Sequence, residues 1–131
     1  MPLKDVPVAG RRGRILVVDD EELVLRLVER SLSEEHDVVT VTSATTALVL
    51  CTSGEKFDLI LCDLIMPDMT GMDLHREIAR AAPELLDRMV FLTGGAFTTR
   101  ARQFLSEIAG EHVEKPFELA SLRKLVRRYV K

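Results

Sequence analysis

The sequence predicts an α/β domain built on a parallel sheet, and three observations carry this prediction. Short apolar segments alternate five times with longer segments that have the helical period. Four of the apolar segments are nearly continuous, as strands buried on both faces of a parallel sheet require. The chain has 131 residues, of which 47% are hydrophobic, which is enough for the core of one domain.

The strands are expected in the apolar segments at residues 15–18, 38–41, 59–62 and 89–92, with a weaker fifth segment around residues 112–113. The helices are expected between and after them, at residues 21–35, 44–53, 71–81, 98–108 and 118–130. Strict strand–helix alternation favours right-handed crossovers between parallel strands. The first helix is expected to bury one apolar stripe, made of Val24, Leu27, Val28 and Leu32.

The beginning of the chain differs in composition from the rest. Prolines and glycines break any period there, and four basic residues up to Arg14 face a single acidic one, Asp5. We expect residues 1–13 to be a flexible basic tail or linker and residues 14–131 to form the folded domain. The folded part is then acidic, because the whole chain has a net charge of −3, and an acidic domain suits a cation site.

Composition excludes several classes of function. The 18 basic and 21 acidic residues are too balanced for direct nucleic-acid binding, and no apolar run approaches the ~20 residues of a membrane helix. Cys51 and Cys62 lack the spacing of a zinc site or a disulfide framework, so we expect them to be reduced and the protein to be cytoplasmic. Because no membrane helix is predicted, we expect no direct membrane contact. His36 and His75 stand apart from the other polar motifs and are expected at the surface.

Polar side chains follow four of the five predicted strands. Asp19 and Asp20 follow the first strand, Asp63 the third, Thr93 the fourth and Lys115 the fifth. Because the carboxyl ends of parallel strands share one edge of the sheet, we expect these five residues to converge there. Three carboxylates in one crevice repel one another unless a cation neutralises them, and an all-oxygen set favours Mg²⁺.

This group of residues has the chemistry for phosphoryl transfer. A carboxylate can attack phosphorus while a cation and a lysine stabilise charge on the transferring oxygens. Asp63 is the best nucleophile candidate because it stands alone at its strand end. A single aspartate at a strand end is more often a helix cap or a turn former, but five such residues on one sheet edge do not fit that interpretation.

The same residues lie in motifs that resemble the receiver domain of two-component response regulators. The matching segments are ILVVDDE at residues 15–21, DLIMPDMTG at 63–71, FLTG at 91–94 and KPF at 115–117. The resemblance covers about residues 14–130. It implies a doubly wound, flavodoxin-like sheet of five parallel strands in the order 2-1-3-4-5, flanked by five helices.

The resemblance also implies a role for each acidic residue. Asp63 would accept a phosphoryl group from a phosphohistidine on a histidine kinase or phosphotransfer protein. Asp20, Asp63 and the backbone carbonyl of Ile65 would ligate Mg²⁺, and Asp19 would hold the ion mainly through water. Because Ile65 offers no polar group to orient an attacking water, we expect intermediate to slow self-hydrolysis of the phosphoryl group.

Thr93 and Lys115 would contact the phosphoryl oxygens, and the Lys115–Pro116 bond would be cis. In the family, inward movement of the threonine lets an aromatic residue of the fifth strand rotate inward, and His112 occupies that position here. We therefore expect Thr93 and His112 to form the switch, with a weaker or pH-sensitive response at His112. The switch would change the surface made by the fourth helix, fifth strand and fifth helix, which would bind a downstream protein or a second copy in a homodimer.

Two other functions stay open. A phosphatase with an aspartyl nucleophile needs a second aspartate two residues later, where this chain has Ile65. A pseudo-receiver that binds partners without phosphorylation would lack an acidic or lysine position, and none is missing here. As an isolated receiver the domain would be no enzyme beyond assisting its own phosphorylation and dephosphorylation. Residues 91–97 also resemble receivers attached to hybrid sensor histidine kinases, and in such a protein it would be part of a kinase.

Overall fold

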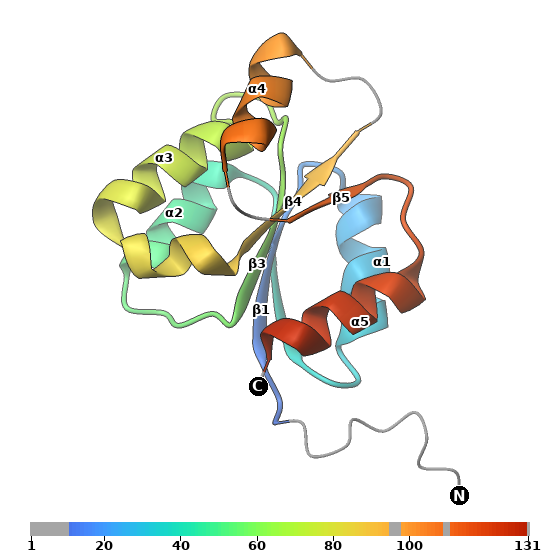
Figure 1. Ribbon diagram of the computed structural model, residues 1–131. Coiled ribbons are helices and arrows are strands. Elements are labelled where there is room, and N and C mark those ends of the chain that lie inside the picture. The colour runs from blue at the N-terminus through green and yellow to red at the C-terminus, as the bar shows by residue number, and fades with distance from the viewer. Residues whose placement is uncertain (1–10, 95–97, 109–110, 131) are drawn as a thin grey trace, which may run out of the picture.

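The computed structural model describes residues 11–94, 98–108 and 111–130 (Figure 1). Its strands are β1 (Arg14–Val18), β2 (Asp37–Val41), β3 (Leu59–Asp63), β4 (Met89–Thr93) and β5 (His112–Glu114). They form one parallel sheet in the order β2-β1-β3-β4-β5. The predicted fold class and strand order are therefore confirmed.

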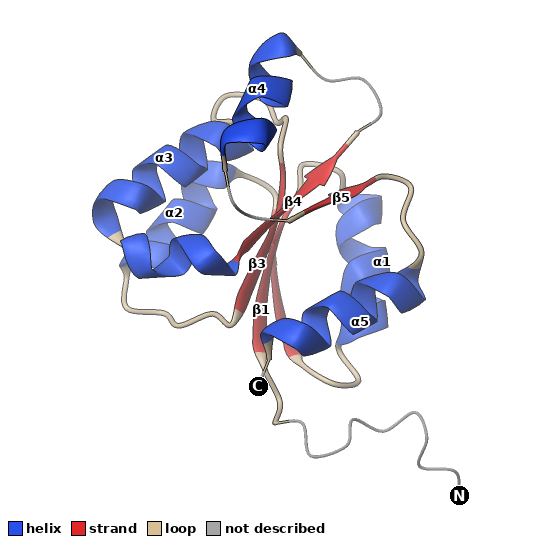
Figure 2. Cartoon of the chain, in the orientation of Figure 1, coloured by secondary structure: helices blue, strands red, loops and turns tan. Residues whose placement is uncertain are grey.

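The helices cover both faces of this sheet. They are α1 (Glu22–Leu32), α2 (Ala44–Thr52), α3 (Gly71–Ala81), η1 (Pro83–Arg88), α4 (Thr99–Glu107) and α5 (Leu119–Tyr129). Figure 2 shows α1 and α5 on one face and α2 and α3 on the other. The 3₁₀ helix η1 is absent from the prediction, because a segment of six residues is too short to show a helical period. No helix among the described residues is long and apolar enough to cross a bilayer.

The central strands divide their side chains between two cores. Ile15 and Val17 of β1 pack toward α1 and α5, whereas Leu16 and Val18 pack into the core that α2 and α3 cover. Every residue of β3 and β4 is buried. Because both faces are covered, these strands need apolar residues at successive positions, which explains the continuous runs in the sequence.

The buried stripe of α1 differs from the prediction. Leu27, expected in the core, is 46% exposed, whereas Leu25 is only 6% exposed and packs with Val28 and Leu32. The N-terminal half of α1 contains more apolar residues than one stripe holds, so spacing alone could not choose between Leu25 and Leu27. Packing against α5 and the sheet settles the choice.

The segment that precedes β1 contacts the domain. Asp37 donates its backbone N–H to the carbonyl of Gly13 at 2.8 Å, and Arg12 Nε donates to the Asp37 carboxylate at 2.8 Å. Residues 11–13, which the sequence assigned to the tail, thus extend the pairing of β1 with β2. Residues 1–10 lie outside the described residues, so a flexible tail there stays a prediction.

Gly71 begins α3 where the chain passes close to the end of β3. Its N–H donates to the carbonyl of Leu64 at 2.9 Å, and an added Cβ would lie 2.5 Å from the carbonyl oxygen of Asp63. Since the obstructing atoms belong to the backbone, they cannot rotate away. Thr70 precedes Gly71 and forms a capping box with Asp73, which fixes where the helix starts.

Replacing Gly71 by alanine is therefore expected to lower the free energy of unfolding by about 1–3 kcal/mol, the usual cost of overpacking. Urea denaturation measures this loss. Gly94→Ala is the matched control, because the described residues leave its added Cβ free of contacts within 4 Å. Equal denaturation midpoints for the two variants would contradict the prediction.

Candidate functional site

Each of the five predicted site residues lies at the carboxyl end of a strand. Asp63 and Thr93 are the last residues of β3 and β4, Asp19 and Asp20 directly follow β1, and Lys115 directly follows β5. The register places Val18 beside Cys62 and Asp63 beside Leu92, so the strands end level with one another. This common edge is where parallel sheets bind ligands.

Three of these residues form an acidic cluster. Asp19, Asp20 and Asp63 each offer a carboxylate oxygen, and these oxygens lie within 4.8 Å of one another. Asp19 and Asp63 are buried at 0% and 6% exposure, whereas Asp20 is exposed. An all-oxygen set that is open to solvent on one side fits a hard divalent cation such as Mg²⁺, which keeps part of its water shell in proteins.

Lys115 supplies positive charge to the cluster. Its Nζ donates to Asp19 Oδ2 at 2.7 Å and lies 3.4 Å from Asp63 Oδ2. Burial lowers the pKa of Lys115, but the hydrogen bond that it donates to Asp19 and the charges of Asp63 and Asp19 outweigh burial, so the pKa is raised and the ammonium stays charged. The Lys115–Pro116 peptide bond is cis, as the resemblance implied.

Glu21 is a member of this site that sequence reasoning missed. Its carboxylate lies 3.4 Å from Lys115 Nζ, and its backbone N–H donates to Asp19 Oδ1 at 2.9 Å. Glu21 directly follows Asp20, so its place in the first motif was the available signal. It adds an exposed negative charge at the rim of the cluster.

Asp63 has a strongly perturbed carboxyl group. Burial first, and then the negative charge of Asp19, raise its pKa from 3.8 to about 7, against the opposing effects of Lys115 and the Ile65 amide. The Ile65 N–H lies 3.4 Å from Asp63 Oδ1. Without a cation the two buried carboxylates cannot both ionise easily, so a divalent ion would favour the ionised form.

Thr93 and His112 occupy the predicted switch positions. Thr93 is buried at 1% exposure, and its hydroxyl donates to the carbonyl of Val113 at 3.4 Å, which directs it toward β5. His112 is exposed in β5, where it pairs in register with Phe91. The Ile65 side chain is 42% exposed, at the mouth of the site.

The expectation that the other two histidines lie at the surface is wrong for His36, whereas His75 is partly exposed. His36 is buried at 3% exposure. His75 is half-buried and packs edge-on against Phe104, with ring centroids 5.1 Å apart. Burial lowers the pKa of both imidazoles and so favours their neutral form. Neither residue belongs to the acidic cluster.

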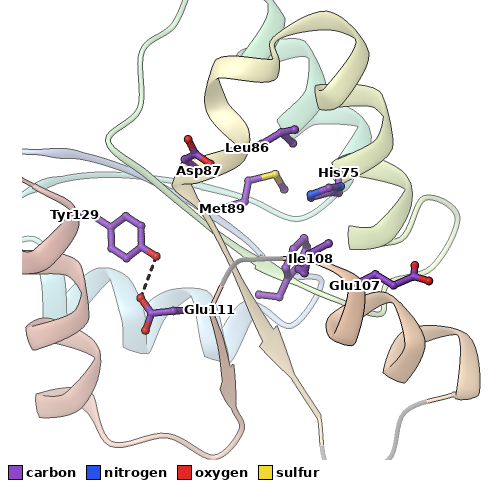
Figure 3. A pocket seen from close by; sticks show the side chains of 9 residues that line it. His75, Leu86, Asp87, Met89, Glu107, Ile108, Glu111 and Tyr129 are labelled. Atoms are coloured by element: carbon purple, nitrogen blue, oxygen red, sulfur yellow. Dashed lines mark hydrogen bonds between the residues drawn. The ribbon is translucent and has the colours of Figure 1, made fainter.

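A separate hollow of about 490 Å³ lies between α3, η1 and the C-terminal ends of α4 and α5 (Figure 3). Met89 and Phe91 of β4 line it, and Tyr129 donates to Glu111 Oε1 at 3.0 Å on one side. None of the predicted site residues lines this hollow. It is therefore distinct from the acidic cluster.

Comparison with known families and proteins agrees with this geometry. The family model of the response regulator receiver domain matches residues 15–127. The chain is 31% identical over 115 residues to the DNA-binding transcriptional regulator NtrC of Azospirillum brasilense, covering 87% of this chain and 23% of that protein. It is 30% identical to the aerobic respiration control sensor protein ArcB of Escherichia coli K12, covering 88% of this chain and 15% of that protein. The chain thus spans only a small part of these relatives.

Two solved structures share the fold. One is a response regulator receiver domain protein from Clostridium thermocellum, with 29% identity, a TM-score of 0.77 and coverage of 89% of this chain and 93% of that one. The other is the receiver domain of the sensor histidine kinase PA1611 from Pseudomonas aeruginosa PAO1, whose structure has a magnesium ion coordinated in its active-site cleft. It has 23% identity, a TM-score of 0.78 and coverage of 90% of this chain and 97% of that one. The matched residues include the whole acidic edge of the sheet, and the chain belongs to the response regulator receiver domain family.

Proposed function

We propose that this domain is a phosphoacceptor switch in which Asp63 takes a phosphoryl group from the phosphohistidine of a histidine kinase or phosphotransfer protein. One observation carries the proposal. The Asp63 carboxylate is buried beside Lys115, with two further carboxylates close enough to share a cation. This arrangement combines a nucleophile with positive charge for the phosphoryl oxygens.

In the transfer, an Asp63 carboxylate oxygen attacks phosphorus and the phosphorus–nitrogen bond of the phosphohistidine breaks. The electron pair of that bond goes to the donor imidazole, and Asp63 becomes an acyl phosphate. Asp19, Asp20, Asp63 and the Ile65 carbonyl would hold Mg²⁺, which supplies positive charge to the phosphoryl oxygens. The Lys115 Nζ lies 3.4 Å from Asp63 Oδ2. Because it is already this close, the ammonium would shift from Asp19 toward the new phosphoryl oxygens on Asp63.

The output of the switch would arise on the neighbouring surface of α4, β5 and α5. The Thr93 hydroxyl now donates to Val113 and would turn toward the phosphoryl group, which offers stronger acceptors. Ala101 is the only buried residue of the described part of α4, so few contacts oppose a shift of that helix. A downstream protein or a second copy of the chain would bind the changed surface. His112 is exposed on the β5 part of this surface.

The proposal is tested by incubating the protein with acetyl phosphate and Mg²⁺ and measuring intact mass. The parent should gain one phosphoryl group, and Asp63→Asn should lower the rate of uptake at least about 100-fold because the nucleophile is gone. Asp68→Asn is the matched control, because Asp68 is exposed on the adjacent loop at a φ of 65°, which asparagine tolerates. Equal mass gain in the Asp63 variant would overturn the assignment.

A further inference from the structure

His36 holds the segment before β1 against the amino end of the sheet. The backbone N–H of Gly13 donates to His36 Nδ1 at 3.1 Å. A nitrogen that accepts a hydrogen bond carries no proton, so this imidazole is neutral with its proton on Nε2. Five residues of β1 separate Gly13 from Asp19, a span of about 20 Å in an extended strand, so this contact lies apart from the phosphoacceptor site.

The segment fits closely into this position. The Arg12 guanidinium donates to the carbonyls of Ser33 at 2.6 Å and Glu34 at 3.1 Å, just beyond the end of α1. An added Cβ on Gly13 would lie 2.4 Å from a methyl carbon of Val130, so any larger residue would require the Val130 side chain to move. Arg11 pairs with the Asp58 carboxylate. These contacts bind residues 11–13 to three separate parts of the domain.

The other ring nitrogen of His36, Nε2, lies in an unfavourable position. This nitrogen is buried and has no hydrogen-bond partner within the described part of the chain. The nearest carboxylate, that of Glu35, lies 3.8 Å away and is already paired with Arg127. A buried N–H without a partner lowers stability, so this histidine serves something other than maximal stability.

We propose that His36 forms a pH-sensitive docking contact, which binds residues 11–13 to the domain at neutral pH and releases them on acidification. A proton added at Nδ1 would point at the Gly13 N–H, so the hydrogen bond would be replaced by two facing donors. The inference does not depend on Asp63 and goes beyond the proposed phosphoacceptor function.

Charges around the ring determine the direction of the response. Arg12 from the docked segment and Arg127 from α5 oppose protonation, whereas Glu35 after α1 and Asp58 before β3 favour it. Burial is the largest effect, and the pKa of docked His36 lies below its ordinary value of 6.5. Because the docked state binds fewer protons than the released state, docking is complete above about pH 6.5 and weakens as the pH falls through this range.

The pH dependence of this docking contact is tested by NMR on the full chain between pH 8 and pH 5. The imidazole ¹⁵N shifts of His36 should show the Nε2–H tautomer and a pKa below the ordinary histidine value of 6.5. Amide exchange at Gly13, corrected for the intrinsic rate, should lose protection by up to about tenfold per pH unit as the pH falls from about 6.5 to the His36 midpoint. The amide of Leu61 in β3 reports global unfolding and should stay protected.

Two variants complete the test. Asparagine places a carbonyl oxygen where histidine has Nδ1, so His36→Asn should keep Gly13 protected and remove its pH dependence. His112→Asn, the matched control, should leave the Gly13 profile unchanged. The proposal is overturned if Gly13 protection does not follow the His36 titration, if Leu61 loses protection together with Gly13, or if His36→Asn retains the pH dependence.

Discussion

The metal-free protein is expected to lose stability as the pH rises from about 4 to about 7, and Asp63→Asn is expected to remove this loss. The folded state raises the pKa of Asp63 from 3.8 to about 7, so it binds a proton that the unfolded chain has already released. The free energy of unfolding therefore falls with pH between the two pKa values and levels off above the higher one. A shift of about three pKa units limits the loss to about 4 kcal/mol, and we expect about 2–4 kcal/mol.

Urea denaturation in EDTA at pH 4 and pH 8 measures this difference. Wild type and Asp63→Asn should be similar at pH 4, whereas the variant should be more stable by about 2–4 kcal/mol at pH 8. Added Mg²⁺ should restore stability to the wild type alone, because binding to the folded state stabilises it. Asp68→Asn, on the exposed loop, controls for the loss of an acidic charge and should follow the wild type. A constant difference between wild type and Asp63→Asn at both pH values would contradict the prediction.

The positions of the site residues could be predicted because they interrupt an otherwise apolar pattern. A strand such as β3, buried on both faces, tolerates a carboxylate only at its end, and Asp63 stands there. The parallel topology then places the ends of β1, β3, β4 and β5 on one edge without any knowledge of side-chain contacts. The polar residues at the strand ends and the parallel topology of the sheet both point to this edge. Such agreement allows a site to be predicted from a sequence.

The features that could not be predicted depend on tertiary contacts. Leu25 and Leu27 are equally apolar, and the packing of α1 against α5 and the sheet determines which one is buried. His36 looks like a surface residue because it stands among charged neighbours, yet it is covered by Arg12 and Gly13 from a segment more than twenty residues earlier. Glu21 reaches Lys115 across 94 positions. No periodicity carries information about such pairs.

Replacing Lys115 by methionine is expected to impair phosphoryl acceptance while tightening the binding of Mg²⁺. The ammonium lies 2.7 Å from Asp19 and 3.4 Å from Asp63, and it neutralises part of the charge that would attract a cation. Its removal leaves the buried carboxylates uncompensated, so Mg²⁺ should bind about tenfold more tightly at pH 8. The rate of phosphorylation by acetyl phosphate should nevertheless fall about 10- to 100-fold, because the charge on the transferring oxygens loses a partner.

The opposite signs of these two effects separate a role in charge stabilisation from a loss of structure. A variant that merely unfolds the site would bind Mg²⁺ more weakly and accept phosphoryl groups more slowly. Methionine keeps the apolar stem of the lysine, so packing beside Pro116 changes little. Lys124→Met removes the same charge from an exposed position on α5 and should change neither quantity. Calorimetric titration measures the Mg²⁺ affinity, and intact-mass kinetics measure the rate of phosphorylation. Weaker Mg²⁺ binding by the Lys115 variant would contradict the assigned role of the ammonium.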